Sequence, residues 1–453
     1  MFPPFPIEIA HQFCLKLIQE IQNGNVYFEQ IAAESEERKG QGVMLGCLVV
    51  WDKKKQKRKI LYSNSGNGKI LKSKKNFINN NEFIFVDSIV SGKQIEDVLF
   101  QNDYEIHKIT DLINSEKSKN QNEKYNLLEK LKKQRKKLTD ESLKKVFSLY
   151  SFTRFDGKKI TLNQIIDLHN KKMPPAGTGD CCDAKLLSYA FENDFLPVSM
   201  DEIYFGKSTK NKSTGKSYPP CDERCGYILP EILGLEILYR DNDIVVINKK
   251  SGLLSVAGKG IEKSDCAESR IKILFPQCIL QPAVHRLDME TSGILILALN
   301  KNAHKNLEKQ FSEKLVQKKY VALLDGILYG KPSGHIELKF RVDTENRPHQ
   351  IYDEINGKLA VTDWKKIGVE KITDQKSGKE KKVTRIEFFP KTGRTHQLRL
   401  AAACEKGLNL PIVGDSLYGS KNAFQRLMLH SSEVTFFHPT SGKKMKISCK
   451  IPF

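Results

Sequence analysis

The stretch that most constrains this chain is the apolar run Ile294–Leu299, which follows directly on the loop sequence His-Arg-Leu-Asp-Met-Glu-Thr-Ser-Gly of His285–Gly293. An apolar run entered through a turn of small residues predicts a buried strand. Arg286 and Asp288 lie two residues apart in the loop, so a carboxylate stands beside a cation at the edge of this strand. Catalytic groups need such rigid support. The pattern therefore predicts an active-site loop that leads into the core.

Regular elements are expected on both sides of this loop, from about residue 231 to the end. Apolar and alternating runs predict strands at 235–239, 244–248, 319–324 and 445–449. Asn300 or Asn302 is expected to cap a helix whose apolar residues recur every four positions. Thr395 is expected to cap a second, short helix that Gly407 ends.

Several ordered motifs of this region resemble those of one enzyme family. His285–Gly293 resembles the HRLDxxTSG signature of the RluA-type pseudouridine synthases, and Lys391–Ala403 contains a sequence similar to their GRTHQLR motif. Leu410–Gly419 resembles the family's P-I-x-G-D-x-x-Y-G loop. Lys249–Leu254 resembles its K-P-S-G-L turn, with Lys250 where proline is usual. The resemblance covers about 231–453, roughly half of the chain.

The resemblance implies a fold of the α+β class. We expect a catalytic domain with a mixed, largely antiparallel bent sheet, flanked by helices around a central active-site cleft. An α/β extension with a charged helical segment is expected to precede it. The implied activity is isomerisation of specific uridines in structured RNA to pseudouridine, with no cofactor and no metal.

The resemblance also implies roles for individual residues. Asp288 is the expected catalytic carboxylate, and Arg286 is expected to fill the space that the flipped uridine leaves. Tyr320 is expected to stack on the uracil, although a tyrosine in a strand is also commonly a core residue. Arg394 is the first choice for the cation that pairs with Asp288, and Arg399 is the second.

Three further residues of these motifs are expected at the substrate site. They are His285, Thr291 and His396. His285 is expected to hold structure or position the substrate rather than to act as an acid or base. A surface ion pair is the plain structural alternative for Arg286.

Other functional classes fit these residues less well. A non-catalytic RNA-binding protein that retained the fold would have been free to lose Asp288, Tyr320 or Arg394. A hydrolase with paired carboxylates lacks a convincing second acid, because Glu290 occupies a variable position of the motif.

Charge and composition agree with an RNA partner. Lys and Arg number 74 against 54 Asp and Glu, a formal net charge of +20, which attracts polyanions. A general excess of lysine across the genome is the alternative explanation. Ribosomal RNA, transfer RNA or both are the expected substrates. No signal peptide or membrane span is expected, and we expect a cytoplasmic monomer.

The first half divides into three zones by composition. Residues 1–108 contain an expected hairpin, Met44–Tyr62, whose tip Lys53–Lys59 is basic. Residues 109–150 predict a charged helix or short helical hairpin, with leucines on one face and a basic run at Lys130–Lys137. Residues 151–230 form a connecting region rich in Cys, Pro and Gly. The basic tip has two interpretations, contact with phosphates or a solvated turn. Because of the two basic stretches, our hypothesis is that residues 1–230 help dock RNA.

Four cysteines of the connecting region leave two interpretations open. Cys181, Cys182, Cys221 and Cys225 offer four thiolates, a set that suits tetrahedral zinc. Adjacent cysteines and a C-x₃-C spacing depart from the common C-x₂-C pattern, which favours buried free thiols.

Overall fold

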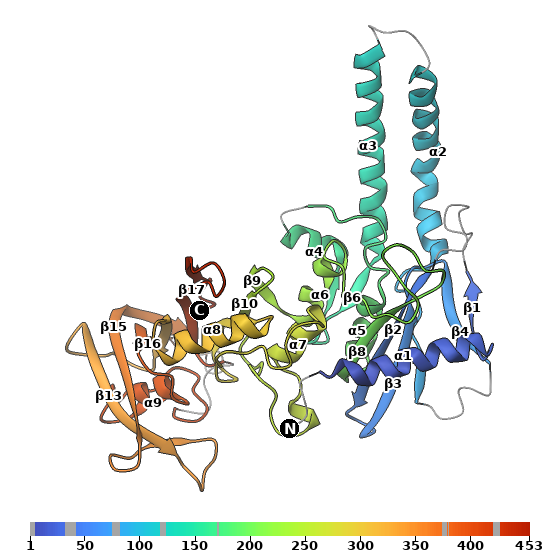
Figure 1. Cartoon of the computed structure of the whole chain (residues 1–453). Coiled ribbons are helices and arrows are strands. Elements are labelled where there is room, and N and C mark those ends of the chain that lie inside the picture. The colour runs from blue at the N-terminus through green and yellow to red at the C-terminus, as the bar shows by residue number, and fades with distance from the viewer. Residues whose placement is uncertain are drawn as a thin grey trace. The chain divides into compact units, whose positions relative to one another are not determined.

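The computed structural model describes residues 5–31, 42–74, 82–117, 124–169, 172–373, 378, 380–419 and 426–453. The chain divides into two compact units (Figure 1). The N-terminal unit comprises residues 5–234 and 273–276, and the C-terminal unit comprises 235–272 and 277–453. Within the described ranges, no helix has both the length and the apolar character needed to span a bilayer.

The N-terminal unit is built on a four-stranded sheet of order β5-β3-β2-β8. Its strands are β2 (Val43–Asp52), β3 (Lys57–Asn64), β5 (Phe83–Phe85) and β8 (Phe195–Phe205), and only β3 and β5 pair in parallel. Helices α1 (Ile7–Gln22) and α5 (Cys182–Glu192) both pack on this sheet. Leu45 and Cys47 belong to the core around α1, whereas a Cβ at Gly46 would lie 2.4 Å from that of Cys182 in α5. Since successive strand residues point to opposite faces, the two helices cover opposite faces, and the expected α/β extension is confirmed.

Shorter elements complete this unit. Strand β1 (Val26–Gln30) pairs with β4 (Lys69–Ser73), and β6 (Ser151–Thr153) pairs with β7 (Lys159–Thr161). Helix α4 (Leu162–Leu168) begins with a capping box formed by Thr161 and Gln164, and α6 (Cys225–Leu233) ends at Gly234, whose φ is 64°.

Two long helices form an antiparallel hairpin that extends away from the sheet of this unit (Figure 1). They are α2 (Gly92–Lys117) and α3 (Lys124–Leu149). The expected charged segment is thus a helical hairpin, but it begins well before residue 109. No Gly or Pro follows Gly92 before Lys117, so nothing in the sequence ends the helix earlier.

The basic tip of the β2/β3 hairpin is shorter than expected. Strand β3 begins at Lys57, so the turn is Lys53–Gln56 alone. Lys59 lies in the strand, is 9% exposed and has its Nζ 3.2 Å from the Asp52 carboxylate. Lys53 pairs with Asp194 at 2.8 Å. The tip therefore offers less free positive charge than its sequence suggests.

The C-terminal unit contains a ten-stranded sheet of order β14-β13-β15-β16-β12-β17-β11-β10-β9, with β18 paired to β17. The strands are β9 (Glu236–Arg240), β10 (Ile244–Lys249), β11 (Ser292–Ala298), β12 (Gln317–Leu324), β13 (Ser333–Val342), β14 (Gln350–Tyr352), β15 (Lys358–Thr373), β16 (Glu380–Pro390), β17 (Leu429–Phe437) and β18 (Lys444–Ser448). Only β11 and β17 pair in parallel. The mixed, largely antiparallel sheet that the sequence predicted is confirmed.

The helices of this unit are α8 (Lys301–Ser312), α9 (Gln397–Ala403) and residues 267–272 of α7 (Ala267–Leu274), with a 3₁₀ turn at Ile261–Lys263. Asn300 caps α8, because its side chain accepts a hydrogen bond from the Ala303 N–H at 2.9 Å. The apolar face of α8 packs on β11.

The predicted cap and end of α9 were wrong. His396, in a left-handed conformation with φ 55°, precedes the helix, and Thr395 is exposed one residue earlier. The helix ends at Ala403, before Gly407. The reason lies in Gln397: its Oε1 accepts hydrogen bonds from the Arg394 N–H and the Thr392 hydroxyl, and this contact sets the entry into the helix.

Candidate active site

Asp288 lies in a loop that is held on both sides by the segment after β10. Ser255, which is 2% exposed, donates its hydroxyl to the Leu287 carbonyl at 2.7 Å and accepts from the Leu287 N–H at 2.9 Å. The Gly252 N–H donates to the Met289 carbonyl at 2.9 Å. Both neighbours of Asp288 are thus fixed through their backbone, which preorganises the carboxylate.

Lys249, the last residue of β10, also holds this loop, through hydrogen bonds from its side chain. Its ammonium is buried and donates to the carbonyls of Leu253 at 2.7 Å, Lys250 at 3.0 Å and Met289 at 3.1 Å. Burial lowers the pKa of Lys249 to about 7, and the nearby charge of Asp288 opposes that decrease. Because it donates to Met289 as well as to Lys250 and Leu253, the Lys249 side chain links the loop of Asp288 to the turn after β10.

Gly293 allows strand β11 to approach β17 after the loop. Its φ is +114°, and a Cβ at this position would lie 2.3 Å from the Ser431 carbonyl oxygen. Glycine is the residue that adopts this conformation without steric cost. The small residues of the motif thus permit the parallel pairing of Ser292 with His430 and of Gly293 with Ser431.

The loop opens into a cleft of about 520 Å³ within the C-terminal unit. Of the residues predicted for the site, all but His396 line it. The lining includes six cations, Arg286, Lys314, Lys318, Lys391, Arg394 and Arg399. Asp288 is the one carboxylate among the described residues of the lining. A single acid in a strongly cationic cleft suits a polyanionic substrate.

Tyr320 lies in β12 and lines the same cleft as Asp288. Burial raises the pKa of Tyr320 to about 12, and the charge of Asp288 acts in the same direction. The phenol is therefore neutral at physiological pH and offers an aromatic face together with a hydroxyl.

His285 is a structural residue in this geometry. Its Nε2 accepts a hydrogen bond from the Ile296 N–H at 3.0 Å, and its ring lies 4.7 Å from the ring of Phe311. Burial lowers the pKa of His285 to about 3, with a smaller contribution from Lys318. A ring that is neutral and already bonded to the backbone is poorly suited to proton transfer at neutral pH.

The two arginines considered as partners of Asp288 have other contacts. Arg394 is exposed, and its Nε donates to the Leu359 carbonyl at 3.0 Å. Arg399 is buried, forms a two-pronged ion pair with Asp415 and lies 2.9 Å from the Glu290 carboxylate. Among the described residues, no ion pair joins either arginine to Asp288.

The remaining predicted residues lie around this cleft. Arg286 is exposed at its lining, and Thr291 donates its N–H to the Asp288 carbonyl at 3.1 Å. The Thr291 hydroxyl is buried without a hydrogen-bond partner. His396 is 8% exposed, its Nδ1 lies 2.8 Å from the Tyr418 hydroxyl, and burial lowers its pKa.

Comparison with known proteins identifies the family. A family model described as RNA pseudouridylate synthase matches residues 243–404. The dual-specificity RNA pseudouridine synthase RluA of Haemophilus influenzae is 40% identical over 222 residues, which are 48% of this chain and 94% of that protein. This chain belongs to the RluA-type pseudouridine synthases. The Escherichia coli K12 protein of the same name is 38% identical over 233 residues, 50% of this chain and 98% of that protein.

A solved human structure is also similar. It is titled Human RNA Pseudouridylate Synthase Domain Containing 1, and 48% of this chain aligns with 84% of it at 29% identity and a TM-score of 0.39.

Some residues that hold this synthase's site were not predicted from sequence. Lys249 and Ser255 position the Asp288 loop, and Gln397 anchors the Arg394 loop through the Val361 carbonyl at 2.9 Å. Their signal in the sequence is weak, because each acts through backbone groups of a distant segment. Only the resemblance of Lys249–Leu254 to the K-P-S-G-L turn marked the first of these segments.

Glu290 does not serve as a second acid in the cleft. Its carboxylate lies 2.9 Å from the Arg399 guanidinium and accepts from the Ser416 hydroxyl at 2.8 Å. The paired-carboxylate hydrolase is therefore disfavoured by the position of this side chain.

A group of potential metal ligands also occurs in this unit, but its atoms already have partners. The Asp241 carboxylate accepts from the Tyr239 hydroxyl and lies 2.7 Å from the His438 Nε2. Asp243 accepts from the Asn300 side chain at 2.7 Å. These contacts fix a turn between two strands.

Proposed function

We propose that Asp288 is the catalytic carboxylate with which this RNA pseudouridine synthase isomerises uridine. The observation that carries this proposal is that Asp288 is the one acid among the described residues of the cleft lining, on a loop anchored by Ser255 and Lys249. The reaction breaks the bond between ribose C1′ and uracil N1 and joins C1′ to C5. The proton leaves C5 and N1 gains one, so no redox partner is consumed. An ionised carboxylate can attack C1′ or remove the C2′ proton.

The test replaces Asp288 with asparagine and measures tritium release from uridine C5 in labelled transcripts. We expect the rate to fall by about 10⁴-fold or more, with RNA affinity changed by less than about threefold. Glu290→Gln is the matched control, because it neutralises the neighbouring carboxylate, which does not line the cleft. That variant should retain turnover. An Asp288→Asn enzyme within about tenfold of wild type would overturn the assignment.

Arg286 and Tyr320 are proposed to receive the uridine. A uridine that leaves its stack loses a few kcal/mol of stacking free energy, and stacking on an aromatic ring restores about 1–3 kcal/mol of it per base. Both side chains line the cleft with Asp288, and the exposed planar guanidinium of Arg286 can take the vacated place in the RNA.

The remaining site residues are proposed to support this step. Arg394 would leave the Leu359 carbonyl and approach Asp288 when RNA enters, whereas Arg399 and His396 hold the surrounding loops. His285 and Thr291 are proposed to position the loop against the substrate. A non-catalytic RNA-binding role is not favoured, since Asp288, Tyr320 and the cationic lining are all in place in one cleft.

Ribosomal RNA, transfer RNA or both are the proposed substrates. The relatives named above are dual-specificity RNA pseudouridine synthases, and the chain carries a net charge of +20. We propose the cytoplasm as the location, because these RNAs are found there, and a monomer as the active form. Mapping pseudouridines in total RNA with and without the gene identifies the modified uridine.

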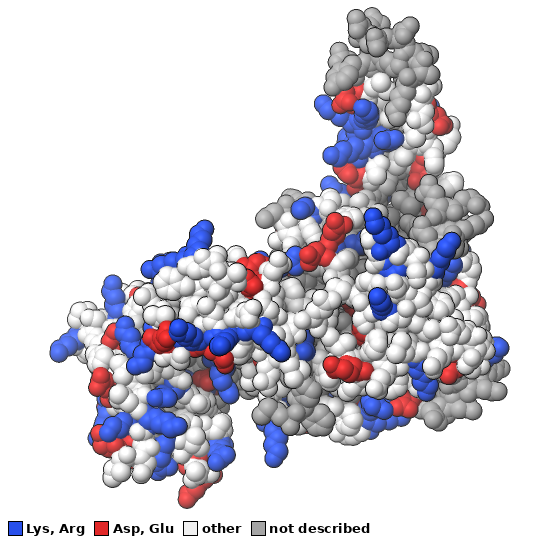
Figure 2. All heavy atoms as spheres, viewed as in Figure 1, with Lys and Arg blue, Asp and Glu red and all other residues white. Residues whose placement is uncertain are grey.

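The N-terminal unit is proposed to dock RNA through the hairpin of α2 and α3. Lysines gather on α3, where blue atoms mark one face of the helix in Figure 2. The exposed ones include Lys130, Lys132, Lys133, Lys136 and Lys137. The helix thus presents cations spaced along one rigid rod, a geometry that suits contact with successive phosphates.

Charge reversal in the full-length protein tests this docking role. Reversal of Lys133, Lys136 and Lys137 to Glu should weaken RNA binding and reduce the slope of log affinity against log salt by about one per lost phosphate contact. The control reverses three exposed lysines of a loop in the same unit, Lys207, Lys210 and Lys216. It makes the same change in net charge. Equal effects of the two triple variants would refute a specific role for the hairpin.

A further inference from the structure

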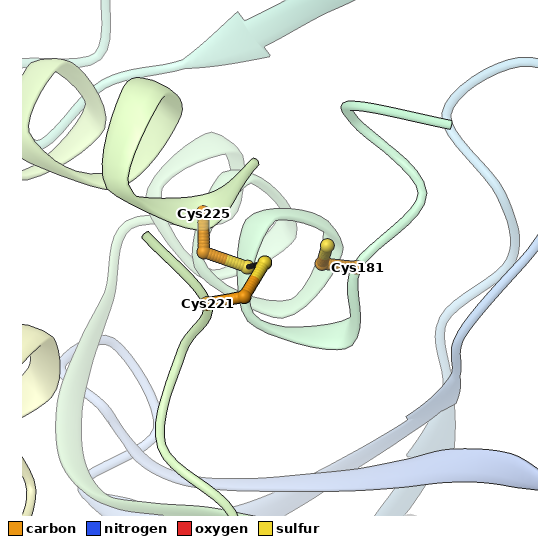
Figure 3. A group of neighbouring side chains, drawn as sticks. All are labelled: Cys181, Cys221 and Cys225. Carbon is orange, nitrogen blue, oxygen red and sulfur yellow. Dashed lines mark hydrogen bonds between the residues drawn. The ribbon is translucent and has the colours of Figure 1, made fainter. Parts of the chain in front are cut away.

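Three cysteines of the N-terminal unit meet although they come from separate segments. The sulfur atoms of Cys181, Cys221 and Cys225 all lie within 4.8 Å of one another. Figure 3 shows Cys181 at the start of α5, Cys225 at the start of α6, and Cys221 on the loop before α6. The Sγ atoms of Cys221 and Cys225 are 3.9 Å apart. The fold therefore brings residue 181 to a pair forty positions later.

The fourth cysteine that the sequence offered does not take part. The Cys182 thiol is buried and donates to the Met44 carbonyl at 3.4 Å, on the side of α5 that packs against Gly46 of the sheet. Cys181 is the extended N-cap residue of α5, whereas Cys182 is the first residue of the helix and its thiol is bonded elsewhere. The set of four considered from sequence therefore reduces to three.

The spacing of the three sulfurs suits a thiolate-bound metal. A Zn–S bond of about 2.3 Å in tetrahedral geometry puts two sulfurs about 3.8 Å apart. The Cys221–Cys225 pair already has that separation, at 3.9 Å, and the widest separation in the group is at most 4.8 Å. Closing the group around an ion therefore requires sulfur movements of about 1 Å or less.

Buried acidic groups next to the cluster supply a second, independent observation. Asp183 is 1% exposed, and both of its carboxylate oxygens are buried without a hydrogen-bond partner. Glu202, 8% exposed, accepts from the Asp183 N–H at 2.9 Å. A buried polar side chain without a hydrogen-bond partner requires an explanation, and a bound ion nearby is one.

We propose that Cys181, Cys221 and Cys225 bind one zinc ion through their sulfurs. Zinc combines soft thiolate ligands with a tetrahedral preference, and the three sulfurs supply three of its four positions. Each thiol releases its proton as it ligates the metal. The ion would tie the start of α5 to the loop before α6. Its role is therefore structural, and it lies outside the isomerisation chemistry.

Metal content of the full-length protein, purified without chelators, tests the site. Elemental analysis should find about one zinc per chain in the wild type, and Cys221→Ser and Cys225→Ser should each bind zinc at least about tenfold more weakly. Cys182→Ala is the matched control, because it removes an adjacent, buried thiol outside the cluster, and it should keep its zinc. Cys404→Ser controls for the loss of any one cysteine.

A second measurement on the wild type keeps the proposal testable if a variant fails to fold. Cobalt added to the metal-free protein should give the intense visible bands of a tetrahedral site and thiolate-to-cobalt charge transfer, and zinc should bleach them. A wild type that binds neither metal in stoichiometric amount overturns the proposal. The proposal is also overturned if Cys221→Ser binds zinc as tightly as the wild type, or if the purified protein contains a Cys221–Cys225 disulfide. Iron in place of zinc in the protein as purified would overturn it as well.

Discussion

Ser255 gives the sharpest test of how the loop of Asp288 is positioned. In Ser255→Ala, the N–H and carbonyl of Leu287 both lose their partner, and Leu287 is only 4% exposed. An unsatisfied buried polar group costs about 1–3 kcal/mol, so two of them should lower the free energy of unfolding by about 2 kcal/mol or more. A loop released by about 1 Å would also reduce turnover by about 100-fold.

Turnover and stability are measured separately. Single-turnover tritium release gives the rate of the chemical step, and RNA affinity is measured by filter binding. Unfolding of the C-terminal unit is followed by the fluorescence of Trp364 in a Trp51→Phe background, because the chain has two tryptophans and Trp51 lies in the other unit.

The expected signature is a large loss in rate with little change in RNA affinity. A purely structural role would lower stability and leave the rate of the folded fraction intact. Ser264→Ala is the control, because its hydroxyl contacts only the local Ile261 carbonyl. If Ser255→Ala lost stability but kept its rate within about twofold of wild type, the claim that this hydroxyl positions Asp288 would be refuted.

Three further predictions follow from buried groups of the C-terminal unit. The pKa of His285 is lowered to about 3 in the fold, so below about pH 6.5 the unfolded chain binds the proton more readily and acid destabilises the fold. Between pH 6.5 and 4.5 the free energy of unfolding, measured in urea, should fall by about 2–3 kcal/mol more in the wild type than in His285→Gln. Arg399→Met leaves the buried Asp415 carboxylate unpaired, and unfolding should become easier by about 3–5 kcal/mol, with Lys406→Met, an exposed position, as the control. Gly293→Ala places a Cβ 2.3 Å from the Ser431 carbonyl and should cost at least about 2 kcal/mol in thermal unfolding, whereas Gly442→Ala, with open space around it, should cost less.

The core of the site was predictable because its signals are local. The loop His285–Gly293 and the strand after it follow from a contiguous pattern, and the Asn300 cap follows from the next three residues. The pairing of Arg399 was not predictable in this way. Its partner Asp415 lies sixteen residues later and its second contact, Glu290, lies over a hundred residues earlier. Only the tertiary fold decides between partners at such separations.

The basic tip illustrates the same limit for charge. Counting cations over Lys53–Lys59 left phosphate contact and a solvated turn both open. The fold places Asp194, 141 residues away, against Lys53, and it buries Lys59 beside Asp52. Sequence therefore locates positive charge but not the distant carboxylates that neutralise it. On α3, Lys132 pairs with Glu129 of the same helix at 3.1 Å.

Variants of this protein can be expected to fall into two classes, those that weaken RNA binding and those that slow the chemical step. Long-range attraction comes from the excess of Lys and Arg, while the chemistry is proposed to rest on Asp288 in a cleft otherwise lined by cations. Loss of cations on α3 should change the salt dependence of binding and leave the chemical step unaltered. Loss of Ser255 or Lys249 should slow the chemical step and leave the salt dependence of binding unaltered, because these residues hold the Asp288 carboxylate in position. A variant of either kind that altered both quantities equally would show that docking and catalysis are coupled through the fold.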